Sequence, residues 1–81
     1  MRLDTLKMLA HECAPIAHVT QSFVEISDGL EFRLAYLKDK KQYHVVMVVL
    51  DGRDDEQNVR WEIRECFELM RDAIAEGLPC A

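Results

Sequence analysis

Apolar positions recur every three or four residues at both ends of the chain, which is the period of an α-helix with one buried face. Pro15 disfavours helical geometry at the residue before it, so we expect the first helix to end near Cys13. The last helix should begin at Asp54-Asp55-Glu56, where acidic residues suit a helix N-terminus, and stop at Gly77. The predicted stripes are Leu3, Leu6, Leu9, Ala10 and Cys13 in the first helix, and Val59, Ile63, Cys66, Phe67, Met70, Ala73 and Ile74 in the last.

Three segments rich in β-branched and aromatic residues lie between the helices, at 20–26, 30–37 and 42–50. The first two are joined through Gly29. We expect a three-residue loop with Gly29 in the left-handed conformation, because this register pairs Val24 with Phe32 and gathers apolar side chains on one face. In that register Phe23 and Leu37 lie on the opposite face.

The third of these segments is apolar on both faces from Tyr43 to Leu50. Successive side chains of a strand point to opposite sides, so a strand with one face in water should alternate between apolar and polar residues. Two helices can cover one face of a small sheet. We therefore expect a second copy of the chain, or another protein, to cover the other face.

The predicted fold class is α+β, a helix followed by a three-stranded antiparallel sheet and a second helix, with both helices on one face. Residues 1–81 are expected to form one small domain. With 15 Asp and Glu against 10 Lys and Arg, the net charge is −5, which disfavours nucleic acid and anionic membranes as partners. No leader or long apolar run is apparent, so we expect a cytoplasmic protein with reduced cysteines and no membrane attachment.

Two surfaces are candidates for binding. Trp61 points away from the apolar stripe of the last helix, and an aromatic side chain there is typical of interface hot spots. Acidic side chains on the same flank would favour a basic protein partner: Glu65, Glu68 and Asp72.

The second candidate surface is a homodimer interface on the sheet. Its expected members are Phe23 and Leu37 together with Val45, Met47 and Val49 of the third strand, or alternatively Val46 and Val48. The third strand is apolar on both faces, so the sequence leaves open which set faces the helices.

Catalytic and metal-binding patterns are absent from the sequence. His11, Cys13 and His18 lack the paired spacing of zinc ligands, so we expect no metal and no cofactor. His44 has no predicted partner that would make it a general base, and no phosphate-binding or nucleophile motif occurs. We expect no enzyme, and keep a small enzyme that uses His44 as a third hypothesis.

The element order resembles that of double-stranded RNA-binding domains. In those domains lysines at the start of the last helix contact phosphates, whereas this chain has Asp54-Asp55-Glu56 there and its basic cluster at Lys38, Lys40 and Lys41. RNA binding is the alternative function. Small acidic secretion chaperones are also similar in class, charge and size. The leading hypothesis is a protein-binding module, a homodimeric inhibitor, adaptor or chaperone-like protein.

Overall fold

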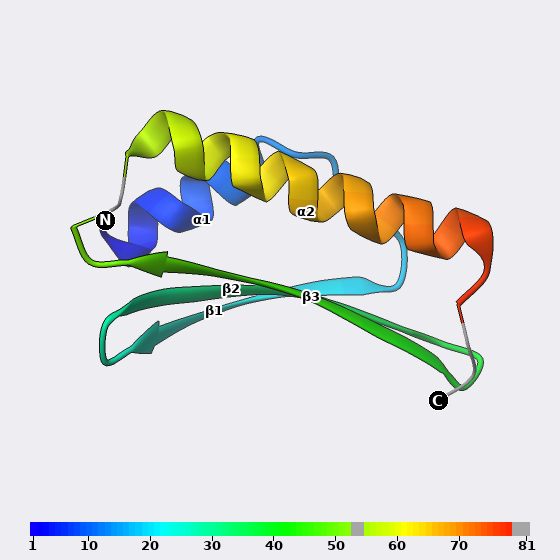
Figure 1. Ribbon diagram of the computed structural model, residues 1–81. Helices are drawn as coiled ribbons and strands as arrows, with labels where there is room; N and C mark the ends of the chain where they lie inside the picture. Colours follow the sequence, from blue (N-terminus) through cyan, green and yellow to red (C-terminus); the bar gives the residue numbers. More distant parts are fainter. Residues whose placement is uncertain (53–54, 79–81) are drawn as a thin grey trace.

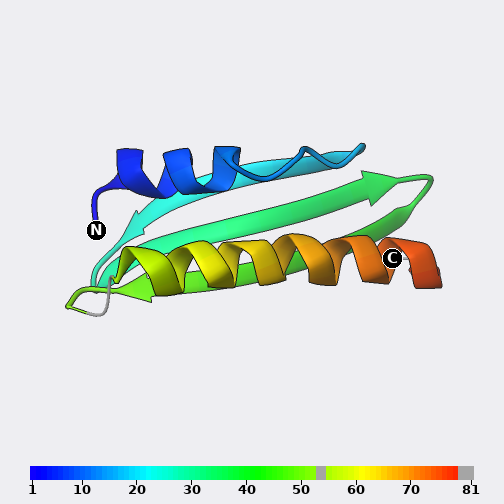
Figure 2. The same cartoon turned by 90° about the horizontal axis from the view of Figure 1, so that it is seen from above.

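The computed structural model describes residues 1–52 and 55–78. Its elements are α1 (Leu3–His11), β1 (Val19–Ile26), β2 (Gly29–Lys38), β3 (Lys41–Leu50) and α2 (Glu56–Glu76). The strands form one antiparallel sheet in the order β1-β2-β3, and both helices lie on the same side of it (Figures 1 and 2). The predicted α+β fold with the order α-β-β-β-α is confirmed.

The core lies between the helices and the sheet, centred on Phe32 of the middle strand. The Phe32 ring is 5.3 Å from Phe23 and 6.2 Å from Phe67, measured between ring centroids, so aromatic contacts join β1, β2 and α2. The other large, fully buried side chains are Leu6, Leu34, Val59, Ile63 and Met70. The apolar stripe predicted for the last helix is therefore its buried face.

The β1–β2 register differs by one residue from the predicted one. Ile26 pairs with Gly29 across a two-residue turn, and Phe23, not Val24, lies opposite Phe32. Gly29 does not have a positive φ. Instead, a Cβ at this position would overlap the carbonyl oxygen of Val49, so glycine is needed for close approach of β2 and β3. The prediction was wrong because Phe23 and Val24 are both apolar, which leaves the hydrophobic pattern unable to choose the register.

Helix and turn geometry follows local signals. The α2 helix is capped by Asp55, whose carboxylate accepts a hydrogen bond from the N–H of Gln57 at 3.1 Å, while Asp54 lies outside the described residues. It ends at Gly77, as predicted, with φ of 90°. The β2–β3 turn is also two residues long, and Asp39 and Lys40 both have positive φ, as in a type I′ turn.

Candidate functional site

One face of the sheet is not covered by either helix, and we call it the open face (Figure 1). Exposed side chains of β1 and β3 make one half of it apolar, each with between 38% and 48% of its surface exposed: Val24, Ile26, Val46, Val48 and Leu50. The register places Val24 and Val48 on either side of Glu31. It places Ile26 and Leu50 on either side of Gly29, which has no side chain to separate them.

Opposite charges lie in the middle of the open face. Arg33 and Glu31 are two residues apart on β2, and Arg33 donates a hydrogen bond to the Glu31 carboxylate at 3.0 Å. This pair satisfies both charges within one strand. The open face therefore presents apolar strips along its two edges and a neutral ion pair along its centre.

The structure separates the predicted dimer residues between the two faces of the sheet. Val45, Met47 and Val49 are buried beneath α2, and Phe23 is half-buried on the same side. Their assignment to the uncovered face is corrected, because pairing across the β2–β3 turn puts Val45 and Met47 beside the core residues Leu34 and Phe32. Leu37 does lie on the open face and is 66% exposed.

The alternative pair, Val46 and Val48, is the one on the open face. Val24, Ile26 and Leu50 were not predicted there. The one-residue shift in register moves Val24 and Ile26 to this side of the sheet.

Trp61 lies on the outer surface of α2 and is 60% exposed. Glu65, Glu68 and Asp72 are also exposed along this helix. Within residues 1–52 and 55–78, the Trp61 ring has no aromatic or cation–π contact. The four side chains predicted for this patch are therefore all exposed.

Arginines occupy the other flank of α2 and hold α1 and the following loop. Arg60 donates hydrogen bonds to Glu12 at 2.8 and 3.2 Å and to Glu56 at 3.3 Å. The hydrogen bond from Arg60 lowers the pKa of Glu12, and the bond to Glu12 raises the pKa of Arg60. Arg71 donates to the carbonyl oxygen of Ala14 at 3.2 Å.

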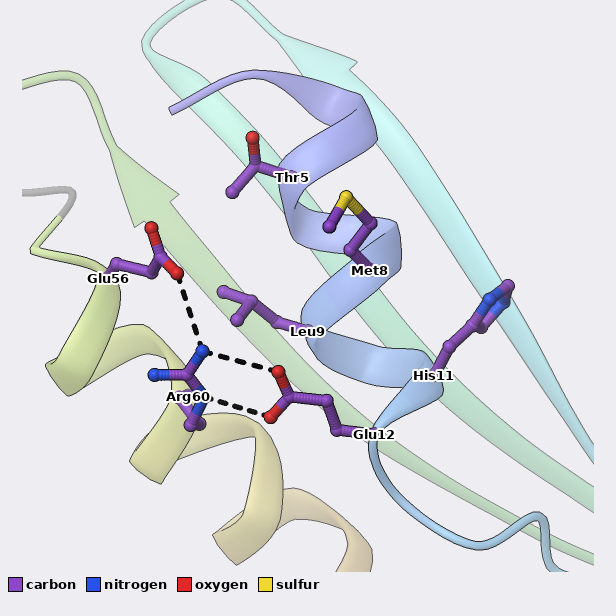
Figure 3. Close-up of a pocket in the computed structure, with 7 residues that line it drawn as sticks. All are labelled: Thr5, Met8, Leu9, His11, Glu12, Glu56 and Arg60. Carbon is purple, nitrogen blue, oxygen red and sulfur yellow. Dashed lines mark hydrogen bonds and ion pairs between the residues drawn. The ribbon is translucent and has the colours of Figure 1, made fainter.

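The ion pairs of Arg60 close one side of a cleft of about 340 Å³ between α1 and the start of α2, which Figure 3 shows in close-up. Met8 and Leu9 form its apolar wall. The His11 ring points away from the Arg60 ion pairs in this view. Arg60, Glu12 and Glu56 are thus paired with one another across the cleft.

A second hollow, of about 560 Å³, lies at the other end of the open face and is lined by His18 and His44 among others. The His44 ring shares a hydrogen bond of 3.1 Å with the Gln42 amide, and His18 makes an edge-on ring contact with Tyr36. The sequence did not predict that His18 and His44 line one hollow. The two histidine rings make no contact with each other. The hydrogen-bond partner of His44 is the neutral side-chain amide of Gln42.

The described cysteines, Cys13 and Cys66, are free thiols. Burial raises the pKa of the Cys66 thiol to about 11 and raises that of Cys13 as well, which reduces the reactive thiolate of both. Cys80 lies outside the described residues. Over residues 1–52 and 55–78, no three His, Cys, Asp or Glu side chains gather closely enough to hold a metal ion.

The basic cluster is remote from the start of the last helix. Lys38, Lys40 and Lys41 lie at the β2–β3 turn, at the opposite end of the sheet from the start of α2 (Figure 1). The described residues at the start of α2 are its N-cap, Asp55, and its first helical residue, Glu56. The described residues at this helix start, 55–59, thus include no Lys or Arg. In the described part of the chain, neither helix is both long and apolar enough to cross a lipid bilayer.

The predicted binding residues that are exposed thus lie on two surfaces, the open face and the outer side of α2. Comparison with known protein families, curated proteins and solved structures finds no match for this chain.

Proposed function

We propose that the chain is a small acidic protein-binding module without catalysis, and that two copies associate through the open face. The observation that carries this proposal is the strip of exposed Val, Ile and Leu side chains on a sheet face that no helix covers. Single apolar residues are common on protein surfaces, but a contiguous patch is typical of an interaction site.

A second copy can cover the open face because the charge pattern at the centre of the face is complementary to itself. A two-fold dimer requires each surface to match its own image. Two copies can stack with their open faces together and with the two-fold axis in the plane between the two sheets. If this axis runs across the strands and passes β2 between Glu31 and Arg33, each Glu31 faces the Arg33 of the other copy. The same rotation sets Val46 of one copy against Val48 of the other. The face is only three strands wide, so we expect a dissociation constant in the micromolar range.

This dimer leaves the outer side of α2 free, so Trp61 and its acidic neighbours remain available to a further protein. An exposed tryptophan among carboxylates favours a partner that has a basic surface. An inhibitor, adaptor or chaperone-like role in the cytoplasm belongs to the same proposal. Reduced cysteines are compatible with that location.

Sedimentation of the purified protein over the micromolar range tests the dimer. We expect a concentration-dependent dimer for the wild type and a monomer for Val24→Lys, which puts a charge into the middle of the apolar strip. Met8→Lys is the matched control, because it makes the same change at an apolar residue that is 69% exposed on α1, away from the sheet. A wild type that stays monomeric, or a Val24→Lys variant that still dimerises, would contradict the proposal.

A further inference from the structure

A groove runs along the free edge of β3, beside α2. It has a volume of about 340 Å³ and is lined by four consecutive strand residues, from Val45 to Val48, and by Glu62, Glu65 and Leu69 of α2. Neighbouring side chains of a strand point to opposite faces, so a hollow that touches four in a row must follow the backbone at the strand edge. We propose that this edge binds an extended, basic segment of another protein, which adds to the sheet as a fourth strand.

The backbone at this edge is available for such pairing. Asp51, which follows β3, donates its N–H to the carbonyl oxygen of Asp28 at 2.8 Å, so odd-numbered residues direct their backbone groups toward β2. Because an antiparallel ladder alternates, Val46 and Val48 direct theirs outward. No other group in the described residues bonds to them there. Outward N–H and C=O groups in a row are a template for a further strand.

The charge of the groove determines which kind of segment can bind at the β3 edge. Glu62 and Glu65 lie above the β3 edge and make no ion pair with any other described residue. Leu69, which is 55% exposed, gives the same groove an apolar surface. An added strand would point every second side chain into this groove. Lysine or arginine suits these positions, because the aliphatic stem can lie on Leu69 while the charged end reaches a carboxylate.

The same charges disfavour a second copy at this edge. Two β3 strands paired about a two-fold axis would bring Glu62 and Glu65 of each chain toward their counterparts, with like charges facing one another. A basic partner removes that repulsion. In the added strand, the side chains that alternate with the basic ones would point to the open face. There they would lie beside Val46 and Val48, where β-branched residues pack well.

The other edge of the sheet lacks these features. Glu25 on β1 has the same orientation as Phe23, toward the helix side. A charged side chain that points inward is one of the devices that protect edge strands from pairing. From Gln42 to Leu50, β3 has no Asp, Glu, Lys, Arg or Pro residue. Strand addition is therefore expected at β3 and not at β1.

The test uses a fluorescent peptide of alternating lysine and valine, and a matched peptide with glutamate in place of lysine. Binding is measured by fluorescence anisotropy on the full chain carrying Val24→Lys, so that the result does not depend on the proposed dimer. We expect only the lysine peptide to bind, and we expect it to slow amide hydrogen exchange at Val46 and Val48.

Three variants distinguish the contribution of backbone hydrogen bonds to peptide affinity from the contribution of charge. Val48→Pro removes an outward N–H without removing a bond to β2, so it should fold and lose roughly tenfold or more in affinity. The double variant Glu62→Lys with Glu65→Lys should lose at least as much. Asp4→Lys with Glu76→Lys makes the same charge change at two exposed carboxylates outside the groove and should stay within roughly threefold of the parent.

Equal binding of the two peptides would overturn the inference, as would an equal loss in the two double variants. Unchanged exchange at Val46 and Val48 would also overturn it. If Val48→Pro fails to fold, the charge variants and the exchange data still decide. Self-association of the Val24→Lys chain with protection of Val46 and Val48 would identify a second copy as the occupant and reject the basic segment.

Discussion

Mutation of Gly29 tests the fold, because a glycine can be required either for close approach of two backbones or for a left-handed conformation. These two reasons predict different responses to mutation. Gly29 begins β2 beside the end of β3. A Cβ added there would overlap the carbonyl oxygen of Val49 and lie 2.9 Å from its carbonyl carbon and 3.0 Å from the Cα of Leu50. These are backbone atoms, so they cannot rotate away as a side chain could. Gly29→Ala must therefore push β2 and β3 apart.

The loss in the free energy of unfolding of Gly29→Ala follows from this separation of β2 and β3. Forcing an extra carbon into a packed site costs about 1–3 kcal/mol. Loss of one ladder bond nearby, such as the one from Asp51 to Asp28, adds about 1 kcal/mol. We expect Gly29→Ala to lower the free energy of unfolding by about 2–4 kcal/mol, out of roughly 4–12 kcal/mol for a chain of this length. Gly29→Asn carries the same Cβ and should cost at least as much.

Urea unfolding at constant temperature measures these differences. Gly52→Ala is the reference for a conformational cost, since Gly52 has φ of 81° and no atom of the described residues lies within 4 Å of an added Cβ. There the penalty is left-handed strain of about 1–2 kcal/mol, which asparagine partly relieves. If Gly29→Asn proved more stable than Gly29→Ala, Gly29 would be left-handed, and the two-residue turn and its register would be wrong.

Two titratable sites give further predictions. The Glu12 pKa is lowered in the fold by Arg60, so its contribution is present above the ordinary glutamate value of about 4.3 and is lost as pH falls through the lower folded value. Thermal unfolding should show the wild type more stable than Glu12→Gln at pH 7, with the gap closing in acid; a gap independent of pH would contradict this. Burial raises the pKa of Cys66 from 9.0 to about 11, so at neutral pH it holds roughly 100-fold less thiolate than an exposed cysteine. Mass spectrometry should therefore find its alkylation by iodoacetamide slower by at least that factor, and a rate near that of free cysteine would refute the prediction.

The helices could be predicted from the sequence because one strong period governs them. In α2, Val59, Ile63, Phe67 and Met70 are all buried, as their spacing indicates. Gly77 then ends the helix with the positive φ that its position suggested. A stripe that wide leaves only one way to place the helix against a sheet.

The sheet faces could not be predicted in the same way, because β1 and β3 have apolar residues on both sides. The hydrophobic pattern does not give the length of the β2–β3 turn, and this length decides which residues of β3 face the helices. Pairing of Lys38 with Lys41 across a two-residue turn fixes Leu34 beside Val45, and hence sends Val46 to the open face. The acidic patch around Trp61 needed no tertiary information, since helix periodicity alone places Trp61 opposite the buried stripe. The groove at the β3 edge depends on how α2 crosses β3, which no local pattern encodes.

The apolar character of β3 on both sides follows from the three surfaces that this one strand supplies. The odd-numbered residues bury their side chains under α2 and pair their backbone with β2, as Met47 does. Val46 and Val48 place side chains on the open face and leave backbone groups at the edge. A strand this apolar at a free edge is an aggregation hazard in an isolated chain. Glu62 and Glu65 lie above the edge, where they repel further acidic chains of the same kind yet attract a basic one. On the strand-addition proposal, the acidic flank of α2 allows an unprotected edge to persist and selects a basic partner for it.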